Sequence, residues 1–277
     1  MSVLSSASRR IAWLARRVFH QPAQNAAEEV WRLRDLHRTP PRQPGTVRWR
    51  GQPLHYRDAP ALLGQLHEIF VQGAYDFTPA TPAPRIIDCG AHVGVAVLRW
   101  RELFPDADIT ALEADPDIVA ALRQNLAARG DNRTRVLAAA AWIADGEVGF
   151  HSTGADDGHV DAAAPRRIPA CDLAALCAAP VDLLKLDIEG AEDAVLAHLD
   201  ATGALRHVRR LVCEWHQWTP AAPRLHLALS RLVAAGFVYR LAGASCLGRD
   251  AAPGFPRLAW AGNHILFYAW REPGFTA

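Results

Sequence analysis

The sequence has few cysteines, a single lysine and no long hydrophobic run. The five cysteines form no CxxC pair and their number is odd, which argues against a disulfide framework or a structural zinc site and favours a reducing cytoplasm. No apolar run approaches the roughly 20 residues that cross a bilayer, so we expect no integral membrane protein. The apolar stretch 11–15 is too short, and too close to arginines, for a secretory signal.

Positive charge is present almost entirely as arginine, and it is unevenly distributed. Lys185 is the single lysine among the 30 basic residues. Residues 1–50 contain ten arginines and three acidic residues, a net charge of +7, so the remaining residues carry −6 because the whole chain carries +1. Such a basic arm suits contact with an anionic membrane surface or nucleic acid, but also a solvated helix or an oligomer contact. The charge leaves these alternatives open, although we expect no nucleic-acid partner.

Length and hydropathy favour one globular domain preceded by an extension. The 277 residues, half of them hydrophobic, are enough for a large core. The proline-rich segment 78–84 separates an N-terminal extension, residues 1–80, from a main domain, residues 81–277. In the extension we expect one or two helices over 5–38, a small hairpin over 47–56 and a helix over 62–71.

From residue 85 the pattern indicates a mostly parallel sheet with helices on both faces, because short apolar runs alternate with helical periodicity. We expect strands at 85–88, 109–113, 134–139, 181–187, 210–215, 237–241 and 264–270. We expect helices at 95–103, 116–128, 192–199 and 223–235. Only a loop joins the last two strands, which predicts an antiparallel pair. Residues 144–170 predict a hairpin at 147–152 followed by an ordered loop.

The first of these strands runs into a glycine turn, DCGAHVG at 88–94, and then directly into a helix. The two glycines allow positive φ and close approach of a ligand, and the helix start offers free N–H groups. The spacing is GxxxG, whereas NAD sites use GxGxxG, and Asp88 would repel a pyrophosphate. An acid here suits the ammonium and sulfonium groups of S-adenosylmethionine (SAM). Glu113, 25 residues after Asp88, is placed to accept the ribose hydroxyls.

A second polar strand end is VDLLKLDIEGAE at 181–192. Alternation along the strand places Lys185, Asp187 and Glu189 on one side. If this strand pairs with the first one, both carboxyl ends face one crevice, with Asp187 toward the reacting centre and Glu189 toward the substrate. A lysine within a buried strand needs a partner, for which Asp187 and Glu214 are the candidates. A purely structural ion pair is the alternative interpretation.

The following strand carries Glu214 and His216 on one side near its carboxyl end. An imidazole near its ordinary pKa suits removal of a proton from a substrate hydroxyl. Trp215 and Trp218 either form a flat apolar wall for a ring system or belong to the core. The carboxylates and the histidine of these strand ends are also metal-ligand types, but no spacing requires a cation and we expect no metal site.

These motifs together resemble the FkbM family of SAM-dependent methyltransferases. The resemblance rests on IDCGAHVG at 87–94, EADP at 113–116 and, most specifically, VDLLKLDIEGAE at 181–192. His92 stands where the family usually has asparagine, and Ala114 where it commonly has proline. The family implies an α/β fold, the doubly wound, seven-stranded, Rossmann-like class I methyltransferase sheet with its last strand antiparallel. It also implies methyl transfer, usually to a hydroxyl oxygen of a sugar, glycan or polyketide.

The resemblance implies a SAM site and an acceptor site at one crevice. His216 is expected to act as base or orienter, with Asp187 and Glu189 positioning donor and acceptor beside Glu214. Ala141 and Trp142 are expected to border the adenine. The full set of expected cofactor-binding residues is Asp88, Gly90, Ala91, His92, Gly94, Glu113, Ala114, Ala141, Trp142 and Asp187.

Three other functions stay open beside O-methylation. An NAD-dependent oxidoreductase is disfavoured by the GxxxG spacing and by Asp88. A nucleic-acid methyltransferase would use the arginine-rich arm and bind with a steep salt dependence. A non-catalytic partner subunit with this fold would bind SAM weakly or not at all.

Overall fold

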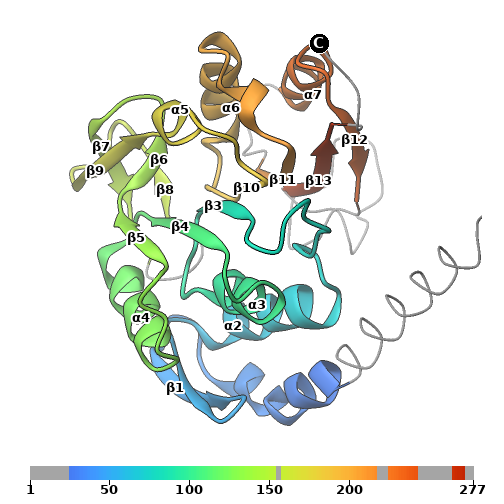
Figure 1. The fold of residues 1–277 in the computed structure, drawn as a ribbon. Helices are drawn as coiled ribbons and strands as arrows, with labels where there is room; N and C mark the ends of the chain where they lie inside the picture. Colours follow the sequence, from blue (N-terminus) through green and yellow to red (C-terminus); the bar gives the residue numbers. More distant parts are fainter. Residues whose placement is uncertain (1–24, 154–156, 217–223, 243–263, 272–277) are drawn as a thin grey trace, which may run out of the picture.

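The structure is a computed structural model that describes residues 25–153, 157–216, 224–242 and 264–271. It has a central sheet between two layers of helices (Figure 1). The basic arm up to residue 24, Trp218 and Cys246 lie outside the described residues.

The central sheet has seven strands in the order β12-β13-β11-β10-β3-β4-β5. The five strands from β11 to β5 pair in parallel, whereas β13 runs antiparallel to both β11 and β12. This confirms the doubly wound, Rossmann-like sheet with its last strand antiparallel, and every expected strand is present. Their bounds are β3 (Arg85–Cys89), β4 (Asp108–Glu113), β5 (Arg135–Ala138), β10 (Leu183–Leu186), β11 (Arg210–His216), β12 (Val238–Leu241) and β13 (His264–Trp270).

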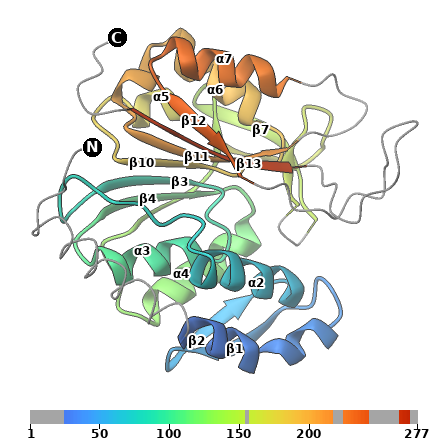
Figure 2. The ribbon, with the colours of Figure 1, turned by 90° about the vertical axis from the view of Figure 1, so that its right-hand side faces the viewer.

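Helices cover both faces of this sheet (Figure 2). Each face has its own apolar cluster. Ile86 and Ile87 are adjacent on β3 yet belong to different clusters, because successive side chains of a strand point to opposite faces. This explains why the strands read as unbroken apolar runs. On one face lie α3 (Val95–Leu103) and α4 (Pro116–Ala127), and on the other α5 (Leu173–Leu176), α6 (Glu192–Ala201) and α7 (Leu225–Ala234). None of the described helices is long and apolar enough to span a membrane.

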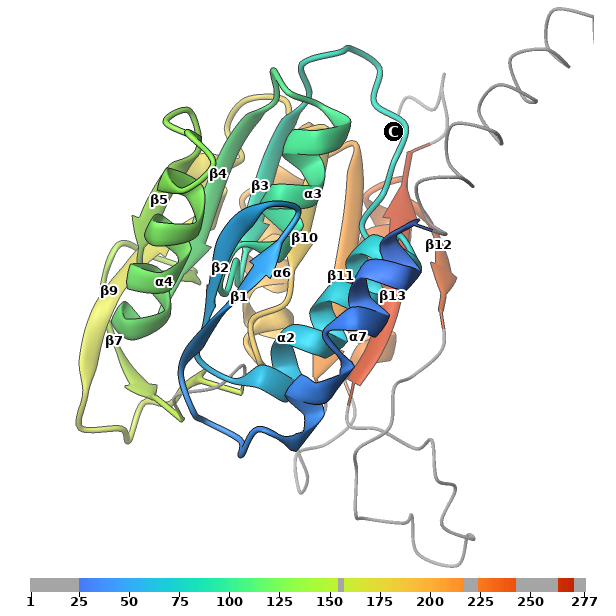
Figure 3. The ribbon, with the colours of Figure 1, turned by 90° about the horizontal axis from the view of Figure 1, so that it is seen from below.

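The N-terminal elements pack on the side of α3 and α4 (Figure 3). Asp58 caps α2, since its Oδ1 accepts the N–H of Ala61 at 2.8 Å. Trp49 and Phe70 are buried in the same apolar cluster as Trp100 of α3. The division at residue 80 stays a prediction, although the two parts share this cluster. The elements are helical turns over 25–32, η1 (Arg34–Arg38), β1 (Gly45–Trp49) paired antiparallel with β2 (Gln52–Tyr56), α2 (Ala59–Leu66) and its π-helical continuation η2 (His67–Val71).

The segment after β5 differs from the prediction of one hairpin and a loop. It forms a second sheet of four strands in the order β6-β9-β7-β8 with its own small apolar cluster. The pattern was too weak to predict it, because the strands are short and a proline, here Pro169 within β9, demotes a strand assignment. The strands are β6 (Ala140–Trp142), β7 (Gly146–His151), β8 (His159–Val160) and β9 (Arg167–Asp172).

Asn125 of α4 connects the N-terminal hairpin to the glycine loop. Its side chain is fully buried; Oδ1 accepts the N–H of His55 at 2.7 Å, and Nδ2 donates to the carbonyls of His55 at 2.9 Å and Val93 at 2.8 Å. We expect Asn125→Ala to lower the free energy of unfolding by about 2–4 kcal/mol, because three backbone groups lose their partner. Urea denaturation measures this, with the exposed Asn132→Ala as control; equal effects of both variants would contradict the role of Asn125.

Candidate active site

A cavity of about 440 Å³ lies at the carboxyl ends of β3, β4 and β10. Its walls come from four parts of the chain: the glycine loop after β3, the ends of β4 and β10, the small second sheet, and α2 with the residues around it. The expected residues that line it are Gly90, Ala91, His92, Glu113, Ala114, Ala141, Asp187, Glu189 and Glu214. Asp88, Gly94, Trp142 and His216 are expected site residues that do not line it.

The two glycines of the loop have different structural roles. Gly90 has φ +81°, and a Cβ there would lie 1.8 Å from the carbonyl oxygen of Asp187, so only glycine fits where β3 and β10 end side by side. Gly94 has φ +93° and begins α3; a Cβ there would lie 2.6 Å from Cδ1 of Leu122. Gly90 therefore shapes the cavity, whereas Gly94 allows α3 to pack against α4.

Glu113 ends β4 and points back toward the glycine loop. Its Oε2 accepts the N–H of His92 and its Oε1 accepts the N–H of Asp115, both at 2.8 Å. Burial raises the pKa of Glu113 to about 7, although these backbone hydrogen bonds oppose the shift. The carboxyl group thus fixes the loop while it faces the cavity.

His92 connects the glycine loop to the N-terminal extension. Its Nδ1 lies 2.8 Å from Nε2 and 3.0 Å from Oε1 of Gln65 on α2, whereas its Nε2 is buried with no hydrogen-bond partner among the described residues. Burial lowers the pKa of His92 to about 4, so the ring is neutral. Its φ of +48° lies in the left-handed region, which asparagine tolerates well. No motif in the sequence pointed to Gln65, because α2 precedes the motif region.

Lys185 holds the ends of β3 and β10 together from inside the sheet. Its Nζ lies 3.2 Å from Oδ2 of Asp187 and 3.3 Å from Oδ1 of Asp88, and it donates to the carbonyl of Gly90 at 2.9 Å. Asp187 is thus confirmed as a partner, and Asp88 is a second partner that the sequence reasoning missed. Asp88 is fully buried behind Lys185, so any influence of Asp88 on a ligand passes through the lysine.

Charge balance explains the protonation of this ion-paired group. Burial disfavours the ammonium of Lys185, but the charges of Asp187 and Asp88 outweigh this effect and raise its pKa. Burial alone would raise the pKa of Asp187, but the charges of Lys185 and His216 lower it. Burial raises the pKa of Asp88, and the charge of Lys185, which acts in the other direction, does not cancel this effect. Lys185 and Asp187 are therefore both charged near neutral pH.

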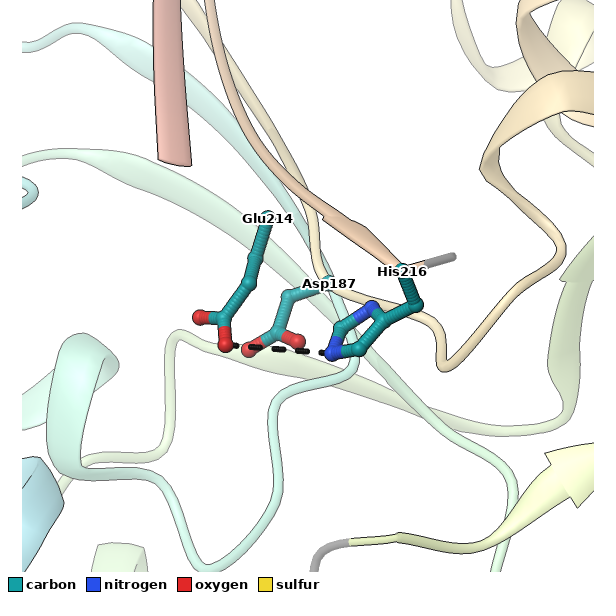
Figure 4. A group of neighbouring side chains, drawn as sticks. All are labelled: Asp187, Glu214 and His216. Atoms are coloured by element: carbon teal, nitrogen blue, oxygen red, sulfur yellow. Dashed lines mark ion pairs between the residues drawn. The ribbon is translucent and has the colours of Figure 1, made fainter. Parts of the chain in front are cut away.

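Asp187, Glu214 and His216 converge from the ends of β10 and β11 (Figure 4). One nitrogen or oxygen of each lies within 4.8 Å of the others. Nε2 of His216 lies 3.8 Å from Oε1 of Glu214 and 3.4 Å from Oε2 of Glu189. Nδ1 of His216 lies 3.0 Å from Oε1 of Glu192, a fully buried residue at the start of α6 that the sequence reasoning missed.

Several carboxylates in a small volume shift the pKa values of this cluster. Burial disfavours the imidazolium of His216, but the hydrogen bond and charge of Glu192 and the charge of Glu189 raise its pKa to about 10. Burial and the charges of Asp187 and Glu68 raise the pKa of Glu214 to about 9. Near neutral pH the ring of His216 is therefore charged and the carboxyl of Glu214 is neutral. Glu68, from η2, also lines the cavity and was missed by the sequence reasoning.

Of the three expected aromatic contacts, Trp142 and Trp215 are not part of the cavity wall, and Trp218 lies outside the described residues. Trp215 is buried in the apolar cluster on the α6 face, so the core interpretation is correct for it. Trp142 packs against that cluster and against the cluster of the second sheet. Ala141, its neighbour on β6, does line the cavity.

The network of Lys185 gives a direct test of the site. We expect Lys185→Met to lower the free energy of unfolding by about 3–5 kcal/mol at pH 7.5, because Asp88 and Asp187 lose their shared cation. Carboxylates left without a cation bind protons at a higher pH in the folded than in the unfolded chain, so the loss should shrink as the pH falls to 5. Urea denaturation at both pH values measures this, with Lys185→Met/Asp88→Asn expected to recover part of the stability. A loss independent of pH would contradict this account.

Comparisons with known proteins identify the family of the chain. The sequence model of the Methyltransferase FkbM domain matches residues 88–239. Type II methyltransferase M.XamI of Xanthomonas campestris pv. amaranthicola is 40% identical over 75 residues, which cover 27% of this chain and only 13% of that protein.

Two solved structures are among those with a similar fold. The FkbM methyltransferase of Methylobacillus flagellatus KT has a TM-score of 0.47 at 15% identity, over 76% of this chain and 54% of that one. The SAM-dependent methyltransferase of Agrobacterium tumefaciens has a TM-score of 0.48 at 13% identity, over 83% and 70%. Because the FkbM domain alone accounts for more than half of the sequence, the chain belongs to the FkbM family of SAM-dependent methyltransferases.

Proposed function

We propose that the cavity binds SAM and that the protein transfers its methyl group to a hydroxyl oxygen of a small molecule or glycan. The observation that carries this proposal is the charge of the cavity. Seven acidic residues line it, whereas Lys185 is the only lysine or arginine among the described lining residues, and its charge is taken up by Asp88 and Asp187. Such a wall favours a ligand with ammonium and sulfonium groups. It disfavours the pyrophosphate of NAD and the phosphates of a nucleic acid.

The end of β4 offers the ribose site. A carboxylate has about four lone-pair positions, and the backbone uses one on each oxygen of Glu113. The remaining positions accept the two ribose hydroxyls. The small side chains of Ala114 and Ala141 leave room for the adenine beside them, and Gly90 allows the methionine part to lie against the backbone.

The carboxyl ends of β10 and β11 form the site for the methyl acceptor. In the transfer, the acceptor oxygen forms a bond to the methyl carbon, the S–CH3 bond breaks, and its electron pair stays on sulfur. The hydroxyl proton passes to a carboxylate that lines the cavity, and the products are a methyl ether and S-adenosylhomocysteine. A pKa of about 10 keeps His216 protonated, which favours the role of orienter over that of base. Its charge holds the carboxylates of Asp187 and Glu189 in place, so the reaction depends mainly on positioning.

Two variants separate cofactor binding from positioning. We expect Glu113→Ala to weaken SAM binding at least tenfold, because the ribose loses its acceptor, about 1.4 kcal/mol or more. We expect His216→Ala to leave SAM affinity within about threefold and to lower turnover. Calorimetric titration with SAM measures the affinities, with S-adenosylhomocysteine and NAD titrated in parallel. Equal loss of affinity in both variants would refute the division of roles, and no SAM binding by the intact chain would favour the non-catalytic subunit.

The pKa of Glu113 gives SAM binding a pH dependence. Ribose hydroxyls donate to the ionised carboxylate, so binding competes with the proton that Glu113 takes up below pH 7. We therefore expect the affinity to fall by up to about tenfold between pH 8 and pH 6. His92, with a pKa of about 4, does not titrate in this range. The amino group of SAM does titrate nearby, so the measurement compares the intact chain with Glu113→Gln. A profile that is the same in both would exclude Glu113 as the origin.

A further inference from the structure

The ends of β10 and β11 bring together a set of side chains that suits a cation better than an organic group. Two carboxylates and one imidazole, from Asp187, Glu214 and His216, offer ligand atoms within 4.8 Å of one another (Figure 4). Bonds of about 2.0–2.2 Å place ligands on opposite sides of a divalent ion about 4.2 Å apart. Small rotations of these three side chains would therefore bring their ligand atoms to bonding distance from one ion. Lys185 occupies Oδ2 of Asp187, which leaves Oδ1 for the ion.

The surroundings of His216 have the form found around metal-bound histidines. Oε1 of Glu192 lies 3.0 Å from Nδ1, and the carboxylate of Glu192 is itself held by the N–H groups of Ile188 at 3.1 Å and Gly190 at 3.0 Å. A carboxylate that accepts the Nδ1–H fixes the tautomer and directs the lone pair of Nε2 toward Asp187 and Glu214. Glu192 is fully buried and does not line the cavity, so its role is to orient the imidazole.

A second observation, independent of the acidic groups, indicates that a polar ligand occupies this part of the cavity. The side chain of His92 is 7% exposed and lines the same cavity. Its Nε2 is buried and has no hydrogen-bond partner among the described residues. Asp187 is the charged group that acts on it most strongly. A buried ring nitrogen without a partner is costly unless a bound ligand or its water shell supplies one.

We propose that Asp187, Glu214 and His216 form a site for a divalent cation, which holds the hydroxyl oxygen of the methyl acceptor on its cavity side. The cation site stands on the geometry alone, and the role for the acceptor rests on the proposed function. One nitrogen and two carboxylate ligands suit first-row ions that accept mixed ligands, such as Mn²⁺. Without the ion, the protonated Nε2 of His216 faces the carboxyl groups of Glu189, at 3.4 Å, and Glu214, at 3.8 Å.

Mn²⁺ is the probe that distinguishes an ion from this proton. The full chain is stripped with a chelator and titrated with Mn²⁺, and free Mn²⁺ is counted by electron paramagnetic resonance in the absence of SAM. We expect one site per chain, and we expect Glu214→Gln and His216→Ala each to raise the dissociation constant at least tenfold. Coupling of the bound ion to a ¹⁴N nucleus in the intact chain should disappear in His216→Ala.

His198 provides the matched control. Like His216 it is a histidine paired with a carboxylate, since its Nε2 lies 2.9 Å from Oδ1 of Asp172, but it is only half-buried and does not line the cavity. His198→Ala should keep the dissociation constant within twofold and retain the ¹⁴N coupling. Circular dichroism checks that each variant is folded. If His216→Ala does not fold, the test rests on Glu214→Gln, which keeps the size of the side chain.

The outcomes separate the cation site from the proposed function. Absence of a Mn²⁺ site in the folded chain overturns the proposal, and so does binding that Glu214→Gln and His216→Ala leave unchanged, because the ion then lies elsewhere. A parallel SAM titration in the presence of the chelator tests the function alone. Mn²⁺ binding without SAM binding supports the cation site and refutes the proposed function. SAM binding without Mn²⁺ binding supports the proposed function and refutes the cation site.

Discussion

Lys185 places its ammonium between the ends of two neighbouring parallel strands, and the cavity depends on that charge. Parallel strands direct their carboxyl ends to the same edge, so acidic residues at the ends of β3 and β10 come close together. Asp88 and Asp187 are tolerated there because Nζ lies 3.3 Å and 3.2 Å from their carboxylates. The same nitrogen binds the carbonyl of Gly90, which joins the turn after β3 to the pair. The buried ammonium of Lys185 thus supports the geometry of both the glycine loop after β3 and the acidic end of β10.

The acidic wall of the cavity follows from this arrangement. Lys185 is paired with Asp88 and Asp187, and protonated His216 supplies the counter-charge of Glu189 and Glu192. Glu192, beneath the ring, has no access to the cavity and acts only through His216. On the proposed function, this charge favours a cationic cofactor over phosphate-bearing ligands before the shape of the cavity comes into play.

The elements with strong local signals were predictable from the sequence, and those that depend on distant contacts were not. All seven strands of the main sheet were identified, because buried parallel strands read as short apolar runs between helices. The second sheet was not, since strands such as β8, with two residues, carry almost no periodic signal. Within the site, Glu113 and Asp187 were found from strand ends. Gln65 was not found, because only the packing of α2 brings it to His92.

The wall formed by α2 and η2 has a consequence for how such a cavity changes during evolution. Residues 88–239, which match the family, supply the glycine loop, Glu113 and the charged strand ends. The opposite wall, with Gln65 and Glu68, comes from a segment that precedes this region. Substitutions within 59–71 therefore reshape this wall of the cavity, and at Gln65 and Glu68 they also act on His92 and on the pKa of Glu214. The cavity thus draws its walls from two stretches of sequence, one inside the family's domain and one before it.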